Sequence, residues 1–319
     1  MKQIFKLQNL IKGLKVWTNL TITKYKINHV CMRLFLGGLI FFFSLASSYG
    51  QGKPNYKLYL SNGKRITYKK LVKKLNSANI ILLGEIHNNP IVHWLTLEIS
   101  KSLNVKNNLI LGSEIFERDN EMFLQQYLNK LIDYNELDSL ARLWPNFETD
   151  YKPLVDYARN NSIKFVSTNI PRRYASLVYT NGFSALENLT KTEKEWISPL
   201  PIKYDPNLPG YKKMMNMIPD HANVNFPKAQ AIKDATMAYF ILQNYSENKL
   251  FLHVNGSYHS DRHGDSSDGI LWYLKNEAPA LKYLTISTVN QENVKKLQPE
   301  NLNKADFLIC IVENMTKTY

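Results

Sequence analysis

Residues 80–87 read IILLGEIH and residues 250–259 read LFLHVNGSYH. Each is a continuous apolar run that leads into a glycine and, three residues after the glycine, a histidine. Continuous rather than alternating apolar residues are typical of a strand that is covered on both faces. The two stretches therefore predict buried, parallel strands with polar side chains at their carboxyl ends.

Further apolar runs of this kind occupy residues 109–111 (continuing to Glu114), 163–167, 283–289 and 307–312. Amphipathic stretches alternate with the runs, at Pro90–Leu103, from Asp119 as a cap through Leu131, at Tyr151–Arg159 and at Lys228–Tyr245. Alternation of strand and helix favours a parallel sheet with right-handed crossovers. We therefore expect an α/β fold with three layers, in which a mostly parallel sheet carries helices on both faces.

One region, residues 184–228, breaks this alternation. It contains six prolines and the cluster MMNM at 214–217. The region is too long for a simple connection and too apolar for a linker. We expect it to be a helical, lid-like insertion within a single domain that spans residues 51–319.

The first 50 residues form a basic leader. They hold seven of the 40 basic residues and none of the 27 acidic ones, so without them the formal net charge falls from +13 to +6. The apolar stretch LFLGGLIFFFSL at 34–45, followed by small residues, is typical of a secretory signal peptide. It is shorter than the roughly 20 residues of a membrane span, although an uncleaved anchor is the alternative. We expect a protein exported to the periplasm, the cell surface or the medium, with Met32 as an alternative start.

Composition excludes several classes of protein. Two cysteines, Cys31 and Cys310, are too few for a disulfide scaffold or a cysteine-based zinc module. No basic block with interleaved aromatic residues follows the leader, so a nucleic-acid partner is not expected. The sequence also lacks HExxH and GxSxG, the common patterns of metallopeptidases and esterases.

Polar residues gather where the predicted strands end. Glu85 and His87 follow the first quoted strand, Glu114 and Arg118 follow the next, and His259 follows the second quoted strand. Because the carboxyl ends of parallel strands share one edge of the sheet, we expect these side chains to meet in one cleft. His87, Glu114 and His259 would suit Zn, Mn or Fe, and the same set without metal would suit acid–base catalysis. Because they follow strands, on loops, we expect their replacement to change fold stability little.

Several of these segments, taken in order, resemble the haem-binding uptake, Tiki superfamily of ChaN-like proteins. They are GEIH at 84–87, SEIFER at 113–118, YARNNSIKFVSTNIPRR at 157–173, QAIKDATMA at 230–238 and GSYH at 256–259. The resemblance implies an α/β fold and a haem site with a tyrosine ligand, in a homodimer served by an outer-membrane uptake partner. Tyr204 and Tyr211, in the insertion, and the nearby His221 are the haem-ligand candidates.

The resemblance leaves two functions open. The first is an exported haem-binding protein in iron or haem acquisition. The second is a metal-dependent hydrolase, a Tiki-like peptidase or an esterase of small molecules or peptides, with Glu85, His87, Glu114, Arg118 and His259 in its cleft. A catalytically silent interaction domain is a third alternative, favoured if the polar groups of the cleft pair with one another.

Overall fold

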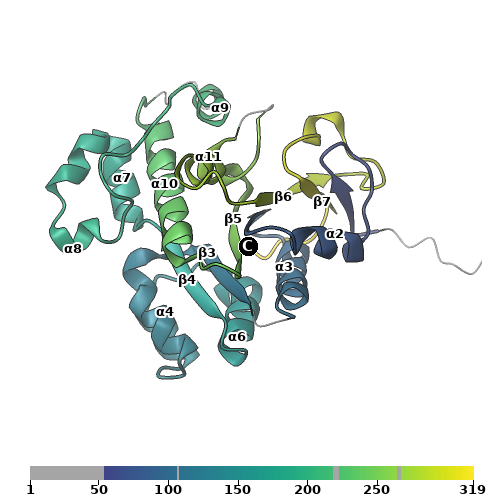
Figure 1. Ribbon diagram of the computed structural model, residues 1–319, viewed down its shortest axis with the longest axis horizontal. Coiled ribbons are helices and arrows are strands. Elements are labelled where there is room, and N and C mark those ends of the chain that lie inside the picture. Colours follow the sequence, from purple (N-terminus) through teal and green to yellow (C-terminus); the bar gives the residue numbers. More distant parts are fainter. Residues whose placement is uncertain (1–53, 106–107, 218–222, 264–266) are drawn as a thin grey trace, which may run out of the picture. The chain divides into compact units, whose positions relative to one another are not determined.

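The computed structural model describes residues 54–105, 108–217, 223–263 and 267–319, which form a compact unit of their own. Seven strands of this unit make one sheet, in the order β1-β7-β6-β2-β5-β3-β4 (Figure 1). Their bounds are β1 (Tyr56–Leu60), β2 (Ile80–Glu85), β3 (Leu109–Glu117), β4 (Lys164–Asn169), β5 (Leu250–Gly256), β6 (Tyr283–Gln291) and β7 (Phe307–Val312). All neighbouring strands are parallel except β1, which runs antiparallel to β7. The predicted α/β class is confirmed.

Helices cover both faces of this sheet. One face is covered by α2 (Tyr68–Leu75), α3 (Pro90–Leu103), α4 (Glu121–Leu128), α5 (Tyr134–Leu140) and α6 (Lys152–Asn160). The other face is covered by α10 (Phe226–Asn244) and α11 (Gly269–Glu277), and α7 (Arg172–Asn181) packs against α10. None of the helices in the described residues is long and apolar enough to cross a membrane.

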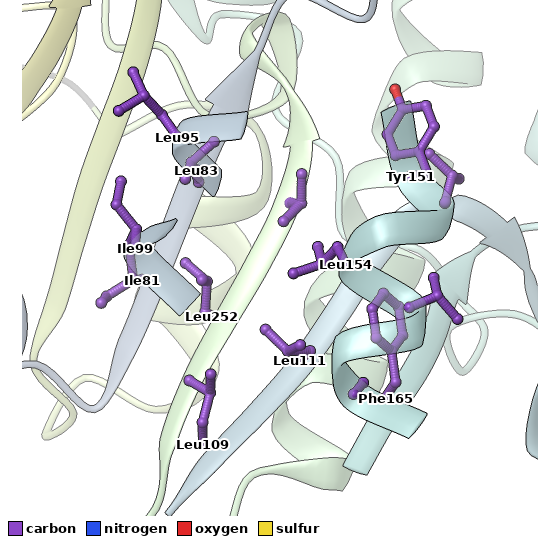
Figure 2. Packing of buried hydrophobic residues seen from close by; sticks show 14 of the residues in the cluster. Ile81, Leu83, Leu95, Ile99, Leu109, Leu111, Tyr151, Leu154, Phe165 and Leu252 are labelled. Carbon is purple, nitrogen blue, oxygen red and sulfur yellow. The ribbon is translucent and has the colours of Figure 1, made fainter. Parts of the chain in front are cut away.

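The continuous apolar runs explain the two layers of core. In β2, Ile81 and Leu83 belong to the cluster beneath α3, whereas Ile80 and Leu82 belong to the cluster beneath α10 and α11. All four side chains have no exposed surface. Figure 2 shows the first cluster, where Leu95 and Ile99 of α3 lie over the side chains of β2. A strand that alternated apolar and polar residues would supply only one of these layers.

The insertion is helical, as expected, and has its own small core. It contains the 3₁₀ turn η3 (Phe183–Asn188), the short helix α8 (Lys191–Lys194) and α9 (Pro209–Met217). Leu186 and Ile197 pack against Ile232 of α10. Tyr211 of α9 packs against Ala231, which also lies in α10. The insertion therefore lies on α10, the helix that leads into β5.

Two details differ from the sequence prediction. The edge strand β1 was not predicted, because its residues YKLYL alternate in polarity and do not form a continuous apolar run. A turn at Gly63, whose φ is +79°, follows it. Asp119 does not cap a helix that reaches Leu131. It lies in the 3₁₀ turn Arg118–Asn120 before α4, and its carboxylate accepts from the Arg142 and Arg173 guanidinium groups instead.

Candidate functional site

The two glycine-x-x-histidine motifs lie side by side. β5 inserts between β2 and β3, and its register with β2 pairs Gly84 with Asn255 and Glu85 with Gly256. A Cβ on Gly84 would lie 2.9 Å from the Cα of Ser257, closer than any side chain tolerates. Glycine at 84 therefore lets the backbone after β5 turn tightly across the end of β2.

The first half of the site is built around the carboxylate of Glu85. Its Oε1 lies 3.0 Å from Nδ1 of His87 and accepts a hydrogen bond of 2.5 Å from the Tyr151 hydroxyl. Its Oε2 lies 3.5 Å from Nδ1 of His93, on the first turns of α3. Glu85 and Tyr151 are buried, whereas a third of the His87 side chain is exposed. Glu85 thus fixes one ring nitrogen of His87 and leaves the other edge of the ring toward the cavity.

A π-helical turn, η2 (Phe147–Tyr151), supplies the supports of this half. Pro153, at the second position of α6, follows the turn, and π-helical turns in proteins occur frequently at functional sites. The turn places Tyr151 on Glu85 and Asp150 within 3.4 Å of His93 Nε2. Asn146, just before it, donates to the main-chain oxygen of His87 at 2.8 Å. The position of His87 is therefore fixed through both its ring and its backbone.

The second half of the site is a buried histidine between two carboxylates. His259 Nε2 lies 3.1 Å from Glu114 Oε1, and His259 Nδ1 lies 2.5 Å from Asp234 Oδ1. Asp234 projects from the middle of α10, and Tyr211 of the insertion donates to its other oxygen at 3.1 Å. One turn earlier on α10, the Nε2 atom of Gln230 lies 2.8 Å from Nδ1 of His259. The insertion is thereby connected to the site through α10.

Burial and charge set the protonation of these groups. Burial opposes the imidazolium form of His259, but the charges of Glu114 and Asp234 outweigh it and raise its pKa to about 9. Burial likewise opposes ionisation of Glu114, yet His259 and the Gly256 amide lower the pKa of that carboxyl. For His87, the hydrogen bond to Glu85 and the charge of Glu114 outweigh burial and raise the pKa. At neutral pH the site therefore holds cationic His259 against anionic Glu114.

Gly256 joins the two halves. Its amide donates to Glu114 Oε2 at 2.7 Å. A Cβ at this position would lie 2.6 Å from His87 Nε2 and 3.5 Å from Glu114 Oε2. The absence of a side chain thus lets His87 approach the end of β5, where the charge of Glu114 reaches it.

A cavity of about 630 Å³ opens beside these residues. Its polar lining includes His87, His259 and Gln230, and its apolar lining includes Met214 and Phe226. Tyr258, in the middle of the turn Ser257–His259, also lines the cavity and is 57% exposed. The cavity therefore combines an apolar wall from the insertion and α10 with the polar ends of β2 and β5.

Four of the predicted site residues meet here and others do not. Glu85, His87, Glu114 and His259 come together at the ends of β2, β3 and β5, and all but Glu114 line the cavity. Arg118 does not join them: it pairs with Glu121 at 3.2 Å and lies 3.9 Å from the Phe240 ring centroid. The reason is that the turn η1 carries its side chain toward β4, where it donates to the main-chain oxygen of Ser167.

Two of the haem-ligand candidates of the insertion, Tyr204 and Tyr211, do not line the cavity. Tyr211 is buried and donates to Asp234, and burial beside that carboxylate raises the pKa of its phenol well above the ordinary value. Tyr204 stacks on Tyr211, with ring centroids 5.6 Å apart, and does not line the cavity. His221 lies outside the described residues.

The expected metal ligands His87, Glu114 and His259 contact carboxylates in this structure: His87 lies against Glu85, and His259 lies between Glu114 and Asp234. Within the described ranges, no group of three or more histidine, cysteine, aspartate or glutamate side chains is arranged to hold a metal ion. Both ring nitrogens of His259 face carboxylates, so a metal bound by this ring would have to displace one of these two contacts. A metal ligand must offer a neutral imidazole nitrogen.

Three functional residues escaped sequence analysis, although two left a signal. Asp234 is the one acidic residue of α10 and directly precedes the largely apolar stretch ATMAYFIL. It has no exposed surface, as expected of a charge that has a partner. His93 follows His87 by six residues, within the helix start that the Asn89 cap and Pro90 predict. Tyr151 gave no signal, because a π-helical turn cannot be distinguished from an ordinary helix start by residue periodicity.

Comparison with known proteins gives one family. The family model described as haem-binding uptake, Tiki superfamily, ChaN matches residues 71–274. The chain is similar in structure to ChaN of Campylobacter jejuni, a protein that binds haem cofacially. The TM-score is 0.60 at 18% identity, over 80% of this chain and 96% of that one, and this likeness shows the fold.

Two further similarities are more distant. The chloroplastic protein RETICULATA-RELATED 5 of Arabidopsis thaliana is 24% identical over 261 residues, which are 75% of this chain. This chain spans 35% of the length of that relative. An erythromycin esterase, EreC, in its open conformation has a TM-score of 0.45 at 9% identity, over 81% of this chain and 97% of that one. A similarity at that level carries no argument about activity.

Proposed function

The chain belongs to the haem-binding uptake, Tiki superfamily, ChaN family, and from this membership we propose that it binds haem, after export, in haem or iron acquisition. One observation carries the proposal: the cavity of about 630 Å³ beside the two glycine-x-x-histidine motifs. Its volume lies within the range of roughly 300–1,000 Å³ that small-molecule and cofactor pockets occupy. Met214 and Phe226 offer an apolar wall to a flat macrocycle.

Tyr258 is the proposed axial ligand of the haem iron. Tyrosine phenolates are known axial ligands of haem iron in proteins. Tyr258 and Tyr319 both line the cavity, and Tyr258 lies next to His259 in the turn that follows β5. Tyr211 is buried against Asp234, and Tyr204 does not line the cavity. The pKa of His87, on the cavity wall, is raised, and its cationic form would attract a phenolate or a propionate.

Haemin titration of residues 51–319 tests this assignment. Wild type should give a shifted Soret band with the charge-transfer band of a high-spin, tyrosinate-bound ferric haem. Tyr258→Phe should remove that band and lower the affinity by more than the roughly 10–100-fold that loss of an outer partner of a metal ligand costs. Tyr204→Phe, which removes a hydroxyl outside the cavity, is the matched control and should bind like wild type. Equal spectra for the Tyr258 and Tyr204 variants would refute the ligand, and an unchanged Soret band for wild type would refute haem binding.

The family's cofacial relative suggests the oligomer. Cofacial binding in the Campylobacter jejuni protein involves two haem groups that face each other. The second haem requires either a second copy of the chain or a second site on the same chain. We therefore propose that a homodimer covers the open side of this cavity, and that an outer-membrane uptake partner receives the haem. Sedimentation velocity with and without haemin measures the first of these steps.

The arrangement around His87 favours a second candidate function, a hydrolase. Glu85 holds His87 Nδ1, and the opposite ring nitrogen lies toward Gly256 and the cavity, as in a histidine general base that a carboxylate orients. Haem binding does not need this carboxylate. The reaction would be hydrolysis of a small ester or amide by a water molecule that His87 deprotonates.

A pH–rate profile with a p-nitrophenyl ester tests the second candidate. His87 acts as a base only when it is neutral, and its pKa is raised, so the rate should increase with pH through a point above 6.5. Glu85→Gln removes the main raising partner and should move that point to lower pH, whereas His87→Ala should reduce the rate by about 10²–10⁴-fold. Glu98→Gln, on the exposed side of α3, is the control. Hydrolysis that survives in the His87 variant would exclude this residue as the base.

A further inference from the structure

The first acidic residue of the chain is Glu85, at the end of β2. Residues 54–84 contain no aspartate or glutamate, and their basic residues are Lys57, Lys64, Arg65, Lys69, Lys70, Lys73 and Lys74. These cations are scattered in the sequence as single residues and pairs. The fold collects them at the β1 edge of the sheet, on β1, the turn after it and α2.

The amphipathic character of α2 determines which way its lysines point. Leu71 and Leu75 have no exposed surface and pack into the core. The four lysines of α2, in two pairs one turn apart, are exposed on the opposite side. Helical periodicity places residues at these spacings on one flank. The outer flank of α2 is therefore a row of four positive charges, which we call the lysine flank.

Neighbouring elements add more lysines, alongside the exposed glutamates Glu292, Glu300 and Glu313. The Arg65 guanidinium donates to the main-chain oxygen of Lys295, which brings the basic pair Lys295 and Lys296 beside the turn. Lys282 donates to Ser77, just beyond the end of α2. On α3, which packs against α2, the Glu98 carboxylate is paired with Lys101 at 2.8 Å. The lysine flank is thus the centre of a wider basic face.

An exposed tryptophan adjoins this face. Trp94 of α3 is 51% exposed, and its ring packs edge-to-face on Tyr56 of β1, with centroids 6.2 Å apart. Tyr56 in turn is close enough to Tyr68, the first residue of α2, to affect its titration. Tryptophan and tyrosine are enriched at the boundary between membrane and water, because each side chain combines an apolar ring with one polar N–H or O–H group.

We propose that this face, made of the lysine flank and Trp94, docks on an anionic membrane surface. Lysine clusters close to a membrane surface are attracted to anionic headgroups, by about 1 kcal/mol per residue. Six of the seven cations in 54–84 are lysines, which act as point charges, whereas nucleic-acid recognition favours the bidentate arginine fork. The pockets beside the site, beside α10 and at the start of β3 and β4 are lined by residues other than the lysine flank.

Vesicle flotation with residues 51–319, which contain the whole described core, tests the proposal. The probes are vesicles of phosphatidylcholine alone and vesicles with about a third phosphatidylglycerol. Wild type should bind only the anionic vesicles and dissociate when salt is raised from about 0.1 M to about 1 M, since the Debye length falls from about 10 Å to about 3 Å. Replacing the four lysines of α2 by glutamine should weaken binding by about fivefold per lysine, a few hundred-fold in total.

The matched control replaces four lysines at the other edge of the sheet and on the insertion, namely Lys130, Lys164, Lys191 and Lys194. It removes the same net charge and should retain binding within a few-fold. Trp94→Phe should abolish the blue shift of tryptophan fluorescence on binding. Equal binding by the α2 variant and the control would overturn the proposal. So would a wild type that ignores anionic vesicles but binds a duplex oligonucleotide through the same lysines, which would assign the face to nucleic acid.

Discussion

Replacing His259 by alanine is expected to lower the free energy of unfolding by about 3–5 kcal/mol, because it leaves buried charge without a partner. Glu114 and Asp234 are 6% and 0% exposed, and His259 is the cation between them. The sequence led us to expect little change in stability, on the grounds that these residues follow strands and lie on loops. Their burial reverses that expectation.

Urea denaturation at neutral pH measures this loss, and His87→Ala is the internal comparison. A third of the His87 side chain is exposed, so its removal leaves less buried charge and should cost less. Similar losses for the two variants would contradict the burial argument.

The pH dependence of unfolding provides an independent check on His259. Its pKa is raised from 6.5 to about 9, so its contribution is complete below pH 6.5 and is lost as pH rises through 9. Glu114 has a lowered pKa, so its contribution is present above pH 4.5 and is lost as pH falls below that value. Wild type should therefore lose stability between pH 6.5 and 9, and the His259 variant should lack that part of the slope. An identical slope in both proteins would mean that His259 is not charged in the folded state.

Replacing Gly269 by alanine is expected to destabilise the protein by about 3 kcal/mol or more, through backbone strain and a clash that cannot be relieved. Gly269 has a φ of +54°, and a Cβ there would lie 2.2 Å from the main-chain oxygen of His259. The contact is with backbone, so no side-chain rotation relieves it. The turn Ser257–His259 would have to move, and with it Tyr258 and the cavity wall.

Thermal unfolding and haemin titration of the Gly269 variant measure both effects. Gly210→Ala is the matched control, because a Cβ there meets its neighbours at 3.4 Å or more and its φ is ordinary. That change falls within α9, where alanine is the better helix former, so stability should be equal or slightly higher. If Gly269→Ala melted like Gly210→Ala, the close approach of α11 to His259 would be wrong.

The strands and the outline of the site were predictable because their signals are local. Continuous apolar runs mark strands that are covered on both faces, and Phe307–Val312 and Pro90–Leu103 have the predicted bounds. The general rule that carboxyl ends of parallel strands share an edge was enough to bring Glu85, Glu114 and His259 together. These inferences need only periodicity and topology.

The partners of those residues were not predictable, because long-range packing determines them. Whether the side chain of Asp234 or of Arg118 reaches the site depends on the direction of α10 and of the turn η1 relative to the sheet. The local pattern of apolar and polar residues does not determine that direction. Arg118 follows Glu114 by four residues and still faces β4, whereas Asp234 is 120 residues away and contacts His259. Of the tyrosines that line the cavity, Tyr258 lies inside the motif GSYH, but only the fold distinguishes it from Tyr204 and Tyr211.

The insertion of β5 between β2 and β3 has a consequence for the order in which the chain can acquire its structure. Until residues 250–256 are present, β2 and the β3–β4 pair have no strand to join them, and their facing edges lack partners. Glu85 and His87 belong to one of these parts and Glu114 to the other, so a nascent chain that ends before β5 has neither a complete sheet nor a complete site. Such a late, long-range closure is slow and exposes unpaired strand edges to aggregation. A chain that leaves the ribosome or crosses a membrane amino-terminus first would therefore acquire sheet and site in one late event, when the residues from Leu250 onward arrive.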